Sequence, residues 1–298
     1  MGDVKPVHKE LIPRRRKTEL SDETNHMKDT QNTDKLIKTA KKAAIAAADI
    51  IMEAFWSRSF TNKSSDEIVT ETDPKAQAAI VDILLGEFPD SGILAEEGLN
   101  GEKLYKKPPA EPNGVWWVID PIDGTTSFAH SLPSFSVCIG AFADGVPMAG
   151  VVYNPNTQTF YAGTKGTGAW ANEHRITVSD EPINPFAGIA LDIDRKKAEL
   201  EQFWDMVDSI KLRNYGSTAL HISYVANGSL IAAASNRIKF WDIAAAGAVH
   251  VFAGGTLTDW HNRDIFPFDI QAYQAQKVQF IASNKSVHTD MLALLKEE

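Results

Sequence analysis

The chain has 298 residues, a formal net charge of −9 and a pI near 5.4. This length is sufficient to bury a large core, as one domain or as two lobes packed together. The acidic balance argues against a general nucleic-acid binder and against a protein that docks on anionic membranes. An acidic enzyme still binds anionic substrates when bound cations reverse the local field.

Residues 1–33 are polar and charged, and we expect them to form a disordered tail. The basic run from Arg14 to Lys17 within it also suits a localisation or docking signal. No apolar run approaches the roughly 20 residues of a transmembrane helix, and the start of the chain lacks the apolar core of a secretory signal. A cytosolic protein is therefore expected. The only cysteine, Cys138, lies in an apolar run, which favours a buried side chain over a nucleophile.

The first half of the chain predicts helices followed by an antiparallel sheet. Small and apolar residues recur at helical spacing over about residues 34–60, and a second helix starts near residues 72–74 and ends by Pro89. Strands are expected over residues 92–95, 115–119, 136–142 and 146–153, with another pair around residues 172–175. Residues 100–114, rich in Gly, Pro and Lys, predict an exposed, mobile loop.

The second half changes near Pro185 to alternating strands and helices, which is typical of an α/β lobe. Its expected strands are residues 189–191, 212–215, 230–234 and 278–282, with another around residue 257. Its expected helices cover residues 200–210, 216–227 and 241–252 and start again near residue 286. We therefore predict a layered α/β sandwich, with an antiparallel-sheet lobe over residues 34–184 and a smaller α/β lobe over residues 185–298. The two lobes would form one integrated domain with the site between them.

The most informative stretch is the end of the apolar strand near residue 119. Asp120 and Asp123 follow it, separated by a turn that contains proline, and Gly124 allows the backbone to approach a ligand. Thr125 and Thr126 then open a helical turn whose free N–H groups suit an anion. For this fragment alone a surface turn is the simpler interpretation. The buried strand that leads into it favours a divalent metal next to a phosphate.

Other carboxylates also stand at strand ends or helix starts, namely Asp73, Glu96 with Glu97, and Asp242. Such junctions are where α/β folds place their chemistry. Buried carboxylates that are brought together repel one another and take up protons unless a cation compensates them. An oxygen-only ligand set favours Mg²⁺ or Mn²⁺ over zinc or copper. Each acid alone is more simply a helix cap or a surface charge, so this prediction rests on their joint occurrence.

These residues resemble sequence motifs of a known protein family. Residues 117–128 resemble the first signature of the inositol monophosphatase family, and residues 241–247 with 253–255 resemble its second. The segment Ala95-Glu96-Glu97 stands where that family has its metal-binding glutamate. Residues 67–73 resemble an upstream family segment, with Glu67 in place of its first aspartate. The resemblance extends from about residue 34 to the C-terminus.

The resemblance implies a phosphomonoesterase in which water, activated by two or three Mg²⁺ ions, attacks the phosphate. The implied metal ligands are the side chains of Glu96, Asp120, Asp123 and Asp242 and the backbone carbonyl of Ile122. Thr125, backed by Asp73, would position and deprotonate the water, with Glu96 assisting on the metal side. The implied substrate contacts are Gly124 and Thr125 through their N–H groups, and Gly216, Ser217, Thr218 and Asp242. Lys63 lies in the loop that closes over the metals in relatives.

Substrate choice is where the chain departs from the family pattern. Inositol-specific members usually carry a glutamate seven residues before the second-signature aspartate, and here Ser235 takes that substrate-binding position, with the basic residues Arg237 and Lys239 nearby. The leading prediction is a small polyol or sugar phosphate. The alternative is a bisphosphorylated or other substrate, such as fructose 1,6-bisphosphate, 3′-phosphoadenosine 5′-phosphate, NADP or histidinol phosphate. Ser235 is equally consistent with a small residue in a tolerant pocket.

An alternative of another class is a catalytically idle regulator that uses this fold for protein contacts, with the basic tail as its docking element. The presence of all the metal carboxylates and of Thr125 speaks against it. The expected partner is a small phosphorylated metabolite, with no nucleic acid and no membrane. Family members are commonly dimers, which this sequence neither supports nor excludes.

Overall fold

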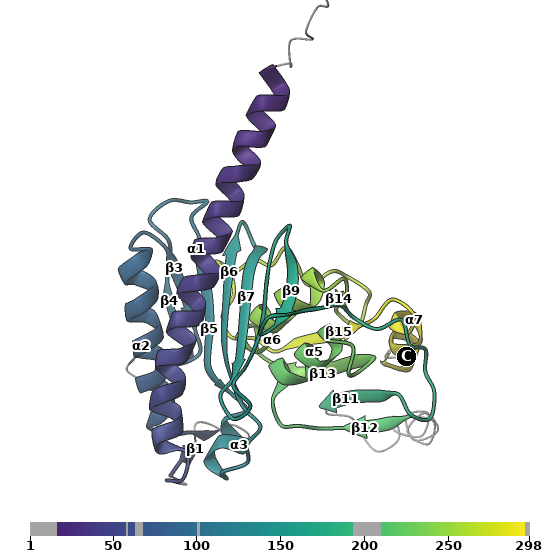
Figure 1. Ribbon diagram of the computed structural model, residues 1–298. Coiled ribbons are helices and arrows are strands. Elements are labelled where there is room, and N and C mark those ends of the chain that lie inside the picture. Colours follow the sequence, from purple (N-terminus) through teal and green to yellow (C-terminus); the bar gives the residue numbers. More distant parts are fainter. Residues whose placement is uncertain (1–16, 58, 63–67, 100–101, 193–209, 296–298) are drawn as a thin grey trace, which may run out of the picture.

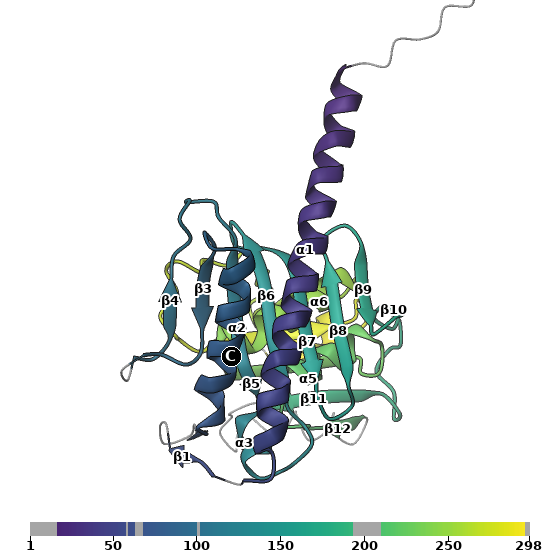
Figure 2. The same ribbon diagram turned by 60° about the vertical axis from the view of Figure 1, so that its left-hand side comes forward.

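The computed structural model describes residues 17–57, 59–62, 68–99, 102–192 and 210–295. Its helices and its two large sheets alternate in layers (Figures 1 and 2). Two helices cover the outer face of an eight-stranded sheet, two further helices separate it from a five-stranded sheet, and a last helix covers that second sheet. The layered α/β sandwich predicted from the sequence is confirmed.

The eight-stranded sheet has the strand order β10-β9-β8-β7-β6-β5-β3-β4. In chain order its strands are β3 (Gly92–Ala95), β4 (Tyr105–Lys107), β5 (Trp116–Asp123), β6 (Ser136–Ala143), β7 (Val146–Asn154), β8 (Thr159–Thr164), β9 (Gly168–Ala171) and β10 (His174–Ile176). Neighbouring strands are antiparallel except β3 and β5, which run parallel. Strand β5 is buried along its whole length because helices cover both faces of the sheet, which explains its unbroken apolar start.

The five-stranded sheet has the order β12-β11-β13-β15-β14. Its strands are β11 (Gly188–Asp192), β12 (Lys211–Arg213), β13 (Ala232–Ile238), β14 (Thr256–Thr258) and β15 (Val278–Ser283). The first three strands in that order are parallel, and β15 is antiparallel to both of its neighbours. A separate short pair, β1 (Thr61–Asn62) and β2 (Ile68–Val69), lies beyond the end of the first helix (Figure 1).

The helices have distinct places in the layers (Figure 1). They are α1 (Lys17–Ala54), α2 (Thr72–Glu87), α3 (Thr125–Ala129), α5 (Thr218–Ala226), α6 (Phe240–Phe252) and α7 (His288–Leu295). Helices α1 and α2 pack on the outer face of the larger sheet, whereas α5 and α6 lie between the two sheets. At the start of α5 the Ser217 hydroxyl accepts the N–H of Leu220, and the helix ends before Gly228 at φ +78°.

The structure differs from the sequence predictions in several places, and the first helix ends at Ala54 instead of near residue 60. Residues 17–33 belong to α1 instead of a disordered tail, because no Gly or Pro interrupts this segment, and residues 1–16 lie outside the described part. Strand β4 lies inside the expected loop of residues 100–114 and pairs with β3. Strand β8 was not foreseen. The helix expected over residues 200–210 falls almost wholly outside the described residues.

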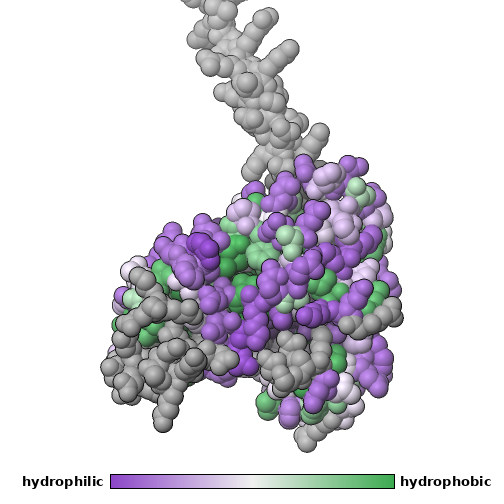
Figure 3. Space-filling view, turned by 180° about the vertical axis from the view of Figure 1, so that it is seen from behind, coloured by the Kyte–Doolittle hydropathy of each residue, from purple (hydrophilic) through white to green (hydrophobic). Residues whose placement is uncertain are grey.

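The polarity of the surface and the burial of the core are typical of a folded domain. Figure 3 shows hydrophilic residues down the middle of one face, with hydrophobic residues only in scattered patches. None of the helices in the described ranges is both long and apolar enough to cross a membrane. Cys138 is buried within β6, as its apolar neighbours predicted.

Candidate active site

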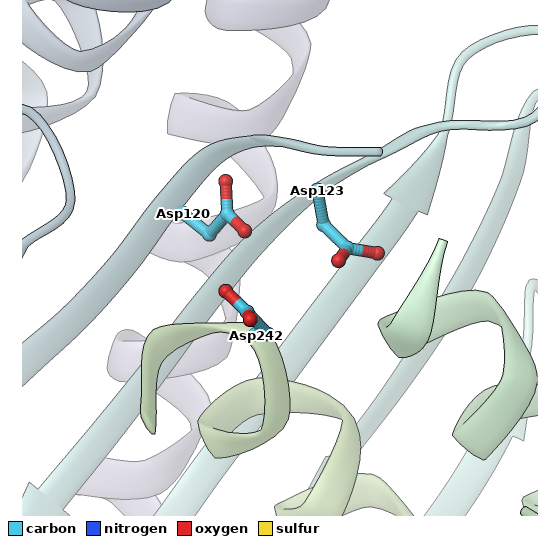
Figure 4. Close-up of side chains that lie close together, drawn as sticks. All are labelled: Asp120, Asp123 and Asp242. Atoms are coloured by element: carbon cyan, nitrogen blue, oxygen red, sulfur yellow. The ribbon is translucent and has the colours of Figure 1, made fainter. Parts of the chain in front are cut away.

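Three aspartates from distant parts of the chain meet where β5 ends. Asp120 and Asp123 come from β5 and Asp242 from the first turn of α6, and one carboxylate oxygen of each lies within 4.8 Å of the other two (Figure 4). In a regular strand, residues three apart point to opposite faces. The pairing of β5 with β6 shifts register between Asp120 and Asp123, and this irregularity brings both side chains to the same side.

Hydrogen bonds from neighbouring groups hold each of these carboxylates. Oδ1 of Asp120 accepts the N–H of Ile122 at 2.9 Å, and Oδ2 of Asp242 accepts the N–H of Lys239 at 2.7 Å. Oδ2 of Asp123 accepts the Ala219 N–H at 2.9 Å and the hydroxyl of the α5 cap, Ser217. A carboxylate offers about four lone-pair sites, so each aspartate retains acceptor capacity for a cation.

The electrostatics of the cluster favour a bound cation. Burial raises the pKa of Asp120 well above its ordinary value, and the charges of Glu96, Asp123 and Asp242 raise it further. Burial raises the pKa of Asp123 to about 6, although its hydrogen bonds oppose the shift. The pKa of Asp242 is also raised, mainly by burial and then by Asp123 and Glu96. Because these closely spaced acids offer oxygen ligands alone, they fit a hard divalent cation such as Mg²⁺ or Mn²⁺.

Glu96, at the end of β3, lies beside this cluster and adds a fourth carboxylate. Its N–H donates to the carbonyl of Ile119 at 3.3 Å, which continues the parallel pairing of β3 with β5. Its charge and a side-chain hydrogen bond contribute to the raised pKa of Asp120. The structure thus brings together the four carboxylates that the sequence predicted as metal ligands.

A hydrogen-bonded chain connects the cavity to Asp73. The Thr125 hydroxyl has two acceptors, the Ile122 carbonyl at 2.9 Å and Oδ1 of Asp73 at 3.3 Å. Oδ2 of Asp73 accepts the hydroxyl of Thr70 at 2.5 Å and its N–H at 2.9 Å. Burial raises the pKa of Asp73 to about 6. Asp73 is itself buried and does not line the cavity, and the Thr125 hydroxyl connects it to that cavity.

The carboxylates open into a cavity of about 210 Å³. Beyond the four carboxylates, its lining residues are Ile68, Ile122, Gly124, Thr125, Thr126, Asp192, Asn214, Gly216, Ser217, Thr218, His221, Arg237, Ile238, Lys239 and Trp241. Gly124, Thr125 and Gly216 to Thr218, which were predicted to contact substrate, all line this cavity. Asp192 also lines the cavity but was not predicted from the sequence, although it lies at the end of strand β11.

Ser235 is not among the residues that line the cavity. It is buried, with 1% of its surface exposed, and its hydroxyl accepts the N–H of Arg237 at 3.3 Å. The resemblance implied a substrate contact at Ser235, but Arg237, two residues later in β13, lines the cavity instead. Lys63 and Glu67, which the resemblance also singled out, lie outside the described residues.

Comparison with known proteins identifies the class of this fold and site. The model of the inositol monophosphatase family matches residues 32–298. A fructose-1,6-bisphosphatase/inositol-1-monophosphatase from Thermotoga maritima is 34% identical over 238 residues, covering 78% of this chain and 83% of that protein. A Nus factor SuhB from Pasteurella multocida is 32% identical over 237 residues, covering 76% of this chain and 85% of that protein.

Solved structures agree with this comparison. The extragenic suppressor protein suhB from Bartonella henselae superposes with a TM-score of 0.77 at 26% identity, covering 88% of this chain and 98% of that one. An IMPase from Thermotoga maritima gives a TM-score of 0.72 at 30% identity, covering 89% of this chain and 96% of that one. The chain belongs to the inositol monophosphatase family and is a phosphoric monoester hydrolase of the inositol-phosphate phosphatase type.

Proposed function

We propose that this protein is a Mg²⁺-dependent phosphomonoesterase that hydrolyses a small polyol or sugar phosphate. The observation that carries the proposal is the cluster of buried Asp120, buried Asp123 and half-buried Asp242, whose ligand oxygens lie within 4.8 Å of one another and whose pKa values are all raised. Together with Glu96 and the carbonyl of Ile122, these side chains would hold two or three Mg²⁺ ions. Bound there, the ions would neutralise phosphate charge and make water more acidic.

The residues of the chain supply proton transfer and positioning. The Thr125 hydroxyl donates toward Asp73 and can accept a proton from the attacking water while passing its own to Asp73. Asp73, whose pKa is raised to about 6, is mostly ionised at neutral pH and still basic enough to take that proton. The N–H groups of Gly124 and Thr125 would hold the phosphate, and Ser217 and Thr218 line the same cavity. This route requires no Cys or His nucleophile.

The names of the relatives support the substrate class. Relatives from Thermotoga maritima and Aquifex aeolicus are both named fructose-1,6-bisphosphatase/inositol-1-monophosphatase, and one from Bacillus subtilis is named inositol-1-monophosphatase. All three names denote phosphate esters of small polyhydroxylated molecules. We carry this class, and no single substrate, to the present chain.

The test is phosphate release from a panel of esters with Mg²⁺ and with EDTA. The panel contains inositol 1-phosphate, fructose 1,6-bisphosphate, histidinol phosphate, 3′-phosphoadenosine 5′-phosphate and NADP. We expect release that requires Mg²⁺, with the sugar and polyol esters preferred over the nucleotides. Release that persists in EDTA would contradict the metal-dependent route, and a nucleotide as the preferred ester would contradict the substrate class.

A second candidate function is regulatory. A relative that is 32% identical is named Nus factor SuhB, a name that denotes a factor and not a phosphatase. In the present chain the four carboxylates, Thr125 and Asp73 are all in place, which supports catalysis. A folded protein that binds Mg²⁺ and releases phosphate from no ester of the panel would favour the regulatory role.

The sequence supports three further proposals. We propose a cytosolic location, association into homodimers, and a two-lobe division near residue 185. The change from the eight-stranded to the five-stranded sheet between β10 and β11 supports the third.

A further inference from the structure

The cavity contains a cationic side chain that the proposed mechanism does not use. Arg237 is exposed and lines the same cavity as the four carboxylates. Within the described ranges, its guanidinium forms no hydrogen bond or ion pair. Such a group, with five N–H donors in a planar fork, is available for an anion that enters the cavity.

Local backbone geometry accounts for the position of Arg237. Strand β13 pairs regularly with β15 up to Ser235, and the register then shifts before Ile238. Arg237 lies inside this irregular stretch, where a bulge redirects a side chain away from its regular direction. The buried hydroxyl of Ser235 accepts the Arg237 N–H at 3.3 Å, which fixes the backbone at this point.

The other basic side chains of the cavity are engaged or neutral. The ammonium of Lys239 donates to the carbonyl of Ala275 at 2.9 Å. His221 accepts the N–H of Tyr215 through Nε2 at 2.7 Å, and burial lowers its pKa to about 4, so it is neutral at physiological pH. Asp192, the acidic neighbour, lies in register with Ser235, and no ion pair joins it to Arg237 among the described residues. Among the described residues that line the cavity, Arg237 is therefore the cationic side chain that no other protein group engages.

We propose that Arg237 binds a second phosphate group of the substrate, so that the preferred substrates are bisphosphorylated sugars or polyols. This inference rests on the proposed function, in which cations at the four carboxylates balance the charge of the scissile phosphate. A monophosphate would then leave the guanidinium facing neutral hydroxyl groups. A second phosphate matches the planar fork and forms paired, charge-assisted hydrogen bonds with it.

The test compares two esters that share the scissile phosphate, fructose 1,6-bisphosphate and fructose 1-phosphate, in the wild type and in Arg237→Gln. We expect the substitution to lower kcat/KM for the bisphosphate on the order of tenfold to a hundredfold, mostly through KM. The monophosphate should be hydrolysed as by the wild type. Arg237→Lys should recover part of the loss, because it restores the charge but not the fork. The matched control is Arg213→Gln, an exposed arginine of β12 outside the cavity lining, which should change neither ester.

Equilibrium binding separates this inference from the proposed function. Calorimetry with Ca²⁺ in place of Mg²⁺ measures the affinity of both esters without turnover. If the wild type binds the bisphosphate more tightly than the monophosphate and Arg237→Gln loses this preference, the inference is supported. A failure to hydrolyse either ester would contradict the proposed function but not the role of Arg237 in binding. Equal affinities for the two esters in the wild type, or an unchanged preference in Arg237→Gln, would overturn the role of Arg237.

Discussion

Replacing Asp120 by asparagine is expected to reduce Mg²⁺-dependent hydrolysis on the order of a thousandfold, because several kcal/mol of metal-dependent stabilisation are lost. Asp120 belongs to the cluster, and the charges of Glu96, Asp123 and Asp242 all raise its pKa. An amide in its place offers a neutral oxygen and loses the charge that attracts the cation. Hydrolysis near the wild-type rate would remove Asp120 from the site.

The same substitution is expected to raise the melting temperature of the metal-free protein. Folding raises the pKa of Asp120 above its ordinary value of 3.8. The stabilisation that Asp120 contributes is thus fully present at pH values below 3.8, where its carboxyl is protonated in both the folded and the unfolded protein. This stabilisation is lost as the pH rises through the raised pKa of the folded protein. Asparagine does not ionise, so metal-free Asp120→Asn should have a higher melting temperature than metal-free wild type at pH 7. The difference between the two melting temperatures should shrink toward pH 4.

Addition of Mg²⁺ should reverse the order of the two proteins. The wild type gains stability by binding the ion in the folded state only, whereas the variant gains little. The control is Glu173→Gln, which changes an exposed carboxylate in the turn between β9 and β10 and should leave both melting temperatures unchanged. A metal-free Asp120→Asn protein that melts below the wild type would contradict the proposed repulsion among the buried acids.

The second large effect is expected for Thr125→Ala, with a loss of roughly a hundredfold to ten-thousandfold in kcat. The Thr125 hydroxyl contacts both the Ile122 carbonyl and Asp73, and an alanine interrupts this connection. Thr125→Ser keeps the hydroxyl and should retain most of the activity. Asp73→Asn should show a similar loss, and the double variant should be no slower than the slower single one, because the two residues act as a unit.

Two measurements distinguish this proton-transfer role from a merely structural one. The rise in melting temperature with Mg²⁺ should be the same in Thr125→Ala as in the wild type, since the carboxylate ligands remain. The wild-type rate should fall as pH drops through about 6, where Asp73 becomes protonated and can no longer accept a proton. Additive losses in the double variant, or a lost Mg²⁺ response in Thr125→Ala, would contradict this role.

Much of the site could be predicted from the sequence because its residues sit at element boundaries. The unbroken apolar run before Asp120 indicated a strand buried on both faces, and β5 is such a strand. Glu96, at the end of β3, and Asp242, at the start of α6, followed the same rule, and the structure brings both to Asp120. Hydrophobic periodicity, turn residues and the family signatures were sufficient for this level of description.

Other features depend on contacts that no local pattern reports. The shift in register that turns Asp120 and Asp123 to one side involves β6, and the hydroxyl that holds Asp123 comes from Ser217 at the start of α5. Ser235 was expected in the pocket, but its hydroxyl supports the backbone at Arg237. Strand β4 was hidden in a segment rich in Gly, Pro and Lys because its pairing with β3 outweighs a weak strand propensity.

The central claim is that cations at the aspartate cluster drive phosphate-ester hydrolysis. The most direct test measures bound Mn²⁺ by electron paramagnetic resonance and phosphate release from fructose 1,6-bisphosphate in the same samples, for wild type and Asp242→Asn. We predict that the wild-type rate rises in step with bound Mn²⁺ and that the variant shows weak binding and little release. Release by the wild type that does not depend on bound Mn²⁺, or full activity in Asp242→Asn, would contradict the claim.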